Sequence, residues 1–176
     1  MGRVPFGEYH GRTNAADNAS LSNILKENIN SSNAYTTWNS FYKVINDCNM
    51  VVEKAPDVAK LDPSFSQSEM KATIAEVSAI RDLCYFYLIR SFRDVPYTTT
   101  AFESDDQQLA LPATPFNQVL DSLIDDLESV QNNAVITYPK SKLYYQVGRV
   151  TQNAIHAMLC EMYLWKGDYA ASVRYA

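Results

Sequence analysis

The sequence predicts an all-α protein built from tetratricopeptide-like helical hairpins that are joined by long irregular loops. Apolar residues recur at three- and four-residue intervals over several long stretches, which is the pattern of helices with a buried face. Only 5 of the 176 residues are glycine, which favours helices over a sandwich or barrel. Near the end of the chain, the turn Gly167-Asp168-Tyr169 separates two apolar helical faces, as in a tetratricopeptide hairpin.

Two segments differ in composition, and we expect them to differ in structure. Residues 1–31 are polar and rich in Asn and Ser, which predicts an irregular arm with at most a short helix near residues 20–28. Residues 32–176 form the predicted helical repeat region, and its first helix should end before Pro56, because proline breaks helices. Residues 55–70 are then a connector. The apolar face of this first helix is Tyr35, Trp38, Phe41, Tyr42, Ile45, Cys48 and Val52.

The second predicted helix runs from about Ser68 to Phe92 and is unusually apolar. Tyr85, Phe86 and Tyr87 follow one another, and successive helical residues point about 100° apart. A helix with aromatics in three directions must pack on at least two sides, so we expect it to be an inner helix. Two of its charged residues, Glu76 and Arg81, should each bond to a neighbouring helix or loop, since an unpaired buried charge is costly.

The remaining helices follow from caps and periodicity. Val95 precedes Pro96, which ends the second helix and opens a loop over residues 94–113. Thr114 should then cap a third helix that begins at Pro115. A second polar loop over residues 131–149 precedes Thr151, the expected cap of a fourth helix at 152–166. The third helix should expose its acidic face, which consists of Asp121, Asp125, Asp126 and Glu128.

The end of the chain suggests a fragment. Gly167 should end the fourth helix and Asp168 should cap the next one. The chain stops at Ala176 within that helix, and a helical pair that ends there does not bury its own face. We therefore expect the repeat region to be truncated at its C-terminus.

Charge and motif content exclude several classes of function. The net charge of −5 and the pI of about 5.0 argue against a nucleic-acid partner. The sequence has no Gly-rich phosphate loop, nucleophile elbow or HExxH motif, so we predict no catalytic residue, no metal site and no cofactor. His156 has no second ligand three or four residues away and is expected to be a packing or rim residue, and Glu103, Asp105 and Asp106 are expected to be solvated carboxylates rather than calcium ligands.

The three cysteines, Cys48, Cys84 and Cys160, lie on apolar helical faces. A free buried cysteine behaves as a small hydrophobe, and we interpret all three as core residues. Their spacing gives no support to a disulfide, although sequence alone leaves that alternative open.

Aromatic rings in polar loops are the remaining candidates for a site, because sugar rings stack on aromatic faces while Asn, Asp and Arg bond the hydroxyls. Tyr138 and Tyr145 in the second loop have this character. The candidate ligand-binding residues are Tyr9, His10, Arg12, Asn14, Tyr97 and Tyr144.

The run AEVSAIRDLCYFYLIRSFRDVPY at residues 75–97 resembles the signature helix of the SusD/RagB family, which ends in Gly-Asp-Val-Pro. TTWNSFYKVINDCNMVVEKAP before it, and PFNQVLDSLIDDLESV and GRVTQNAIHAMLCEMYLWKGDYAAS after it, are similar to further family segments in the same order. The similarity covers about residues 32–176. One difference is Arg93, where the family usually has glycine.

The resemblance implies a nutrient-binding lipoprotein of the Bacteroidetes outer membrane. Such proteins are exposed at the cell surface, have tetratricopeptide-like helix pairs, bind an oligo- or polysaccharide, and cover a SusC-like TonB-dependent transporter. They are not enzymes, and they attach to the membrane only through a lipid anchor. Because no cysteine precedes Cys48, we expect that anchor to be absent from this sequence. They are also much longer, so the resemblance is to their N-terminal portion.

Two alternatives remain at this stage. A tetratricopeptide scaffold that binds another protein, without glycan binding, would carry its exposed aromatics and charges on a concave helical face. A helical enzyme with its catalytic groups outside this chain is a third class, and no residue here supports it.

Overall fold

The computed structural model describes residues 19–28, 30, 32–104 and 110–176, and its helices confirm the all-α prediction. It separates the chain into two units, residues 1–40 and 41–176. The predicted boundary after residue 31 stays a prediction. The helices are α1 (Ala19–Leu25), α2 (Asn39–Leu61), α3 (Gln67–Phe92), α4 (Phe116–Val130), α5 (Leu143–Gly148), α6 (Gln152–Lys166) and α7 (Tyr169–Arg174).

The first unit contains α1, the short helix expected near residues 20–28. In this unit the side-chain amide of Asn33 donates to the Ser20 carbonyl at 2.7 Å, and the Ala34 amide donates to the Ser20 hydroxyl at 3.3 Å. These bonds fold the chain after α1 back onto the start of that helix.

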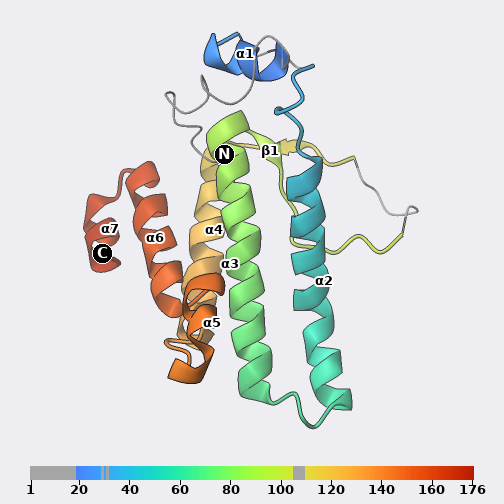
Figure 1. Ribbon diagram of the computed structural model, residues 1–176, viewed down its shortest axis with the longest axis vertical. Helices are drawn as coiled ribbons and strands as arrows, with labels where there is room; N and C mark the ends of the chain where they lie inside the picture. Colours follow the sequence, from blue (N-terminus) through green and yellow to red (C-terminus); the bar gives the residue numbers. More distant parts are fainter. Residues whose placement is uncertain (1–18, 29, 31, 105–109) are drawn as a thin grey trace. The chain divides into compact units, whose positions relative to one another are not determined.

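In the second unit α3 is the inner helix of a layered array, with α2 on one side and α4, α6 and α7 on the other (Figure 1). The ring centroids of Tyr87 and Phe41 are 6.4 Å apart, and those of Tyr85 and Tyr42 are 6.2 Å apart, so both residues of α3 contact α2. Phe86 faces Trp165 of α6 at 6.3 Å. The three consecutive aromatics therefore pack against helices on two sides of α3, as predicted for an inner helix.

The predicted hairpin at the end of the chain is confirmed. The Thr151 side chain accepts a hydrogen bond from the Ala154 amide and caps α6. Gly167 ends α6 with φ at +83°, a conformation that glycine adopts without strain. Asp168 then caps α7 by accepting from the Ala171 amide at 2.9 Å.

The prediction that the first long helix ends before Pro56 is wrong, because α2 continues through it to Leu61. A proline inside a helix lacks one backbone hydrogen bond, at a cost of about 3 kcal/mol. Ala55 beside it is buried, and the Asp62 amide still bonds the Val58 carbonyl at 2.9 Å, so packing and the following turn keep the helix intact. The connector shortens to residues 62–66, and Ser66 caps α3 in a capping box with Glu69.

The predicted cap of α4 is also wrong. Thr114 lies in strand β2 (Ala113–Thr114), which pairs antiparallel with β1 (Val95–Pro96), and Val95 is opposite Thr114. Pro115 takes the cap position without a side-chain bond. Instead, the Asp94 carboxylate accepts from the Phe116 amide at 3.0 Å, across 22 residues. This two-strand ribbon closes the loop that residues 94–113 were expected to form.

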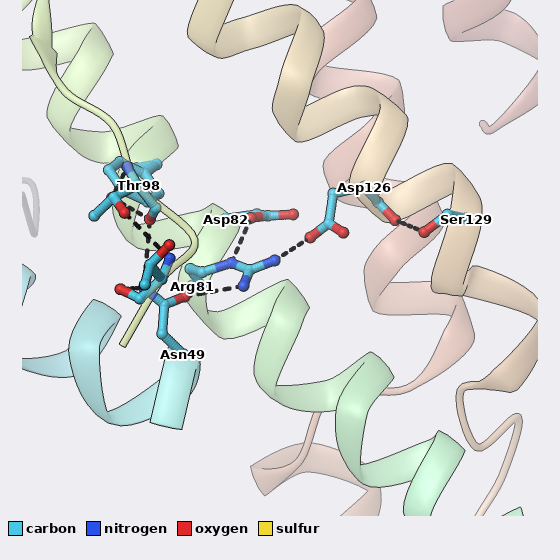
Figure 2. A network of polar contacts seen from close by, with 8 residues as sticks. Asn49, Arg81, Asp82, Thr98, Asp126 and Ser129 are labelled. Atoms are coloured by element: carbon cyan, nitrogen blue, oxygen red, sulfur yellow. Dashed lines mark hydrogen bonds and ion pairs between the residues drawn. The ribbon is translucent and has the colours of Figure 1, made fainter. Parts of the chain in front are cut away.

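Two further expectations change. The loop over residues 131–149 contains the 3₁₀ turns η2 (Gln131–Asn133) and η3 (Lys140–Lys142) as well as α5. On α4 only part of the acidic face is exposed, because Glu128 accepts hydrogen bonds from the hydroxyls of Tyr163 and Tyr175 at 2.6 and 2.9 Å. Asp126 points toward α3 (Figure 2). Pairing with tyrosine and arginine on adjacent helices draws these two carboxylates inward.

Candidate functional site

A buried polar network holds α2, α3 and α4 together around Arg81, whose side chain lies between Asn49 and Asp126 (Figure 2). Arg81 is 3% exposed. Its Nη1 donates to Asn49 Oδ1 at 3.0 Å and its Nη2 donates to Asp126 Oδ2. The expectation that Arg81 pairs with neighbouring helices is confirmed.

The same network fixes the chain that follows β1. Asn49 Nδ2 donates to the carbonyls of Thr98 and Thr100 at 3.3 and 3.2 Å. The Tyr85 hydroxyl donates to the Thr98 carbonyl at 2.9 Å, and the Thr98 amide lies 3.0 Å from the same hydroxyl. Asn49 and Tyr85 thus hold the first part of this loop against α2 and α3.

Asp82 is the least well satisfied member of the network. It is fully buried, its Oδ1 accepts from Arg81 Nε at 3.4 Å, and no donor reaches its Oδ2 within the described part of the chain. Burial, and then the charge of Asp126, raise the pKa of the Asp82 carboxyl well above its usual range, and the nearby Arg81 charge offsets this only partly. The buried site therefore favours the neutral acid at position 82.

A second group of residues lies around α5, in the lower part of the view in Figure 1. We call Tyr138, Tyr144 and Tyr145 the tyrosine cluster. The centroids of the Tyr144 and Tyr145 rings are 4.3 Å apart, and those of Tyr138 and Tyr145 are 5.5 Å apart, both edge-to-face. Tyr144 is 62% exposed. The cluster presents aromatic surface to solvent.

Arg149 connects this cluster to α3. Its guanidinium carbon lies 5.5 Å from the Tyr138 ring centroid and 5.4 Å from that of Tyr145, within the range of cation–π contact. Its Nε donates to Glu76 Oε1 and Oε2 at 2.9 and 3.0 Å, and its Nη2 also donates to Oε2. Glu76 in addition accepts from the Val150 amide at 3.3 Å. Glu76 has the loop partner that its sequence context predicted.

A groove of about 550 Å³ runs beside these residues, and we call it the Arg149 groove. Its walls come from the end of α2, the α2–α3 turn, the first half of α3 and the segment before α6. Aromatic faces, hydroxyls, carboxylates and one guanidinium meet there, which is the donor and acceptor set of a sugar site. The lining residues are Val58, Asp62, Ser64, Phe65, Glu69, Ala72, Thr73, Glu76, Val135, Tyr138, Arg149 and Val150.

The predicted site residues separate into three groups. Tyr144 joins Tyr138 and Tyr145 in the cluster beside the Arg149 groove. Tyr97 is half-buried, with its ring centroid 4.8 Å from that of Tyr85, and burial raises the pKa of its hydroxyl. It lies next to the Arg81 network. The other candidates, Tyr9, His10, Arg12 and Asn14, lie outside the described residues.

Sequence reasoning missed the groove itself. Arg149 and Glu76 are 73 residues apart, and Phe65 and Glu69 lie in and just after the turn that was read as a connector. No pattern of neighbouring residues in the sequence predicts a pair this far apart. The one available signal was Glu76, a charge on a crowded helix that required a partner.

The described residues offer few other candidates for a metal site or a reactive side chain. They contain no group of three or more His, Cys, Asp or Glu side chains that could hold a metal ion, and none of their helices is long and apolar enough to cross a membrane. Cys48, Cys84 and Cys160 are free thiols. Burial raises the pKa of Cys84 to about 11, consistent with a packing role. The His156 ring packs 5.6 Å from that of Tyr175.

Layered helical hairpins define a tetratricopeptide-like helical protein, and this one carries a groove flanked by tyrosines. Residues 5–164 match the SusD-like family described as "Starch-binding associating with outer membrane". The chain belongs to this SusD-like family.

Individual relatives agree with this assignment. The chain is 25% identical over 145 residues to the SusD-like protein P38 of Formosa agariphila, covering 81% of this chain and 25% of that protein. It is 26% identical to a SusD superfamily structure from Bacteroides thetaiotaomicron, with a TM-score of 0.74, covering 91% of this chain and 36% of that one.

A structure described as a laminarin binding SusD-like protein is 24% identical, with a TM-score of 0.79, covering 92% of this chain and 33% of that one. At this identity the likeness shows a shared fold. The chain thus spans about a quarter to a third of the length of these relatives.

Proposed function

We propose that the protein to which this chain belongs binds a glycan and that the tyrosine cluster and the Arg149 groove form part of its binding surface. The observation that carries the proposal is the meeting of three tyrosine rings with Arg149 and Glu76 in a chain of a family described as starch-binding. Sugar C–H faces stack on such rings, and the polar side chains bond the hydroxyls. The structural relative described as laminarin binding supports a carbohydrate as the ligand class.

The proposed mechanism is capture and delivery without chemistry. The family is described as associating with the outer membrane, and we place this protein at the bacterial surface as a lipid-anchored protein. It would hold the glycan by stacking and hydrogen bonds and pass it to a SusC-like TonB-dependent transporter. No catalytic step is part of this proposal, in keeping with a family described by binding.

The test uses the full-length protein in affinity gels that contain laminarin, soluble starch or xylan. Tyr145→Ala removes the central ring of the cluster, and we expect its affinity to fall about tenfold, the worth of one or two stacking contacts. Val147→Ala is the matched control on the same helix, because Val147 is 89% exposed and carries no ring. Equal retardation of both variants and the wild type would refute the placement of the site.

Delivery is tested separately by co-purification of the full-length protein with a SusC-like TonB-dependent transporter expressed in the same cells. Retention of the transporter at a stoichiometric level supports delivery. A protein that binds a glycan but never retains a transporter would be a surface glycan receptor only.

One observation favours a second candidate function, a scaffold for protein binding. Leu164, Trp165, Tyr169 and Val173 of α6 and α7 are all about half exposed or more, so this helical pair presents apolar surface. Under this alternative, Trp165→Ala in the full-length protein would abolish partner binding and Tyr145→Ala would not.

A further inference from the structure

We propose that Glu76 makes the Arg149 groove selective for uncharged glycans, because it neutralises the one cation among the described residues that line the groove. This inference rests on the proposed function and adds to it the class of glycan. It also assigns Glu76 a role in specificity, although its side chain is largely covered.

The first argument is the geometry of the ion pair. Arginine recognises an anion best by presenting two parallel N–H donors, as in a fork. In this structure the Nε and Nη2 donors of Arg149 both point to the Glu76 carboxylate. The rings of Tyr138 and Tyr145 lie within 5.5 Å of its guanidinium carbon. The fork is therefore already occupied by a protein carboxylate.

The second argument is the charge of the groove. Among the described residues that line it, three carboxylates (Asp62, Glu69 and Glu76) face the guanidinium of Arg149, which leaves these residues with a net charge of −2. An anionic sugar that enters meets an unfavourable potential, whereas an uncharged one does not.

Local hydrogen bonds favour the ionised form of two of these carboxylates, Asp62 and Glu69. The Ser64 amide and hydroxyl donate to Asp62 at 2.9 and 2.7 Å, and the same two groups of Ser66 donate to Glu69 at 2.9 and 2.7 Å. These bonds lower the pKa of both carboxyls. The negative charge of the groove is thus built into the α2–α3 turn and the start of α3.

An uncharged sugar fits the same groups well. Its C–H face stacks on the tyrosine cluster, and its hydroxyls are donors for carboxylate oxygens. Arg149 remains a hydroxyl donor through Nη1, held in a fixed orientation by Glu76 and the two rings. The groove can therefore bind sugars without a charged partner.

The test compares laminarin and soluble starch with the same polymers after oxidation of their C6 hydroxymethyl groups to carboxylates, using full-length protein and calorimetry. Wild type should bind the oxidised form of either polymer at least tenfold more weakly than the neutral form. E76Q frees the fork of Arg149 and removes one charge, so it should improve binding of the oxidised polymer about tenfold, an effect that rising salt weakens.

Two further variants distinguish the effect of the occupied Arg149 fork from the effect of the net charge of the groove. E69Q removes the same charge from the groove but leaves the Arg149–Glu76 pair intact, so it should improve binding of the oxidised polymer only two- to threefold. Arg149→Gln should make binding of the oxidised polymer weaker than in wild type. Thermal unfolding checks that each variant is folded, and the opposite signs of E76Q and Arg149→Gln keep the test decisive if either one is unstable.

The outcomes distinguish the inference from the proposed function. If wild type binds oxidised and neutral polymers equally, or if E69Q and E76Q behave alike, the role of Glu76 is refuted while glycan binding stands. If wild type binds none of the four polymers, the proposed function fails and this inference fails with it.

Discussion

The substitution D82N tests whether Asp82 is a neutral acid in the folded protein. Asp82 is fully buried between Arg81 and Asp126, and its Oδ2 receives no donor from the described residues. An asparagine has the same shape and is always neutral. Its side-chain N–H can donate a hydrogen bond to the Asp126 carboxylate. We expect the variant to be as stable as wild type near pH 4 and increasingly more stable as the pH rises.

The sign follows from the raised pKa of Asp82. An aspartate in an unfolded chain has a pKa of about 3.9, and burial and Asp126 raise the folded value well above that. The stability linked to this proton is complete below about pH 4 and is lost as pH rises through the folded pKa. At pH values between the unfolded and the folded pKa of Asp82, the unfolding free energy of wild type falls by up to about 1.4 kcal/mol per pH unit relative to that of D82N. The difference becomes constant once Asp82 ionises in the folded state.

The measurement is urea unfolding of the full-length wild-type and D82N proteins at several pH values between 4 and 9. Asp125→Asn, an exposed change on α4, is the matched control and should stay within about 0.5 kcal/mol of wild type at each pH. A difference in unfolding free energy between D82N and wild type that does not change with pH would refute the reasoning. So would a variant several kcal/mol less stable at every pH, which would show that Arg81 needs an ionised Asp82.

Two further predictions concern helix ends. Arg93 ends α3 with φ at +70°, a strained conformation for a residue with a Cβ, so Arg93→Gly should raise the unfolding free energy by about 1 kcal/mol, whereas Arg93→Ala should give no such gain. Asp94→Ala removes the acceptor for the Phe116 amide and should lower the unfolding free energy by about 1 kcal/mol, whereas Thr114→Ser, at the position first expected to cap α4, should change it by less than half as much. Thermal unfolding checks both, and the reversed order within either pair would contradict the geometry.

The conformation of Arg93 bears on the one difference from the SusD/RagB signature that was noted in the sequence. The SusD/RagB signature usually has glycine at this position, and the positive φ of Arg93 is one that glycine adopts freely. The helix still ends at Phe92, where the sequence predicted it. The departure from the family pattern therefore concerns local strain and leaves the fold unchanged.

The sequence by itself determined the features that depend on neighbours along the chain. Helical periodicity located α3 to within a residue or so and α6 at its exact bounds, and the caps Thr151 and Asp168 and the stop at Gly167 were read from local chemistry. The three aromatics of α3 also identified it as an inner helix. These features were predictable because each depends on residues within about one helical turn.

Tertiary structure decided everything that depends on a distant partner. Pro56 remains inside α2 because packing around it outweighs a missing hydrogen bond, and Asp94 replaces Thr114 as the partner of α4 because a two-strand ribbon brings it there. Asp126 turned inward because Arg81, on another helix, offered a buried cation.

The candidate site shows the same division. Exposed loop tyrosines were predictable as a class, but Tyr97 is half-buried next to the Arg81 network, while Tyr144 joined the cluster beside the groove. The pair Glu76 and Arg149 is joined across 73 residues and has no local signal. Side-chain identity is written in the sequence, but whether a ring or charge faces solvent, a helix or a groove depends on which distant segment packs against it.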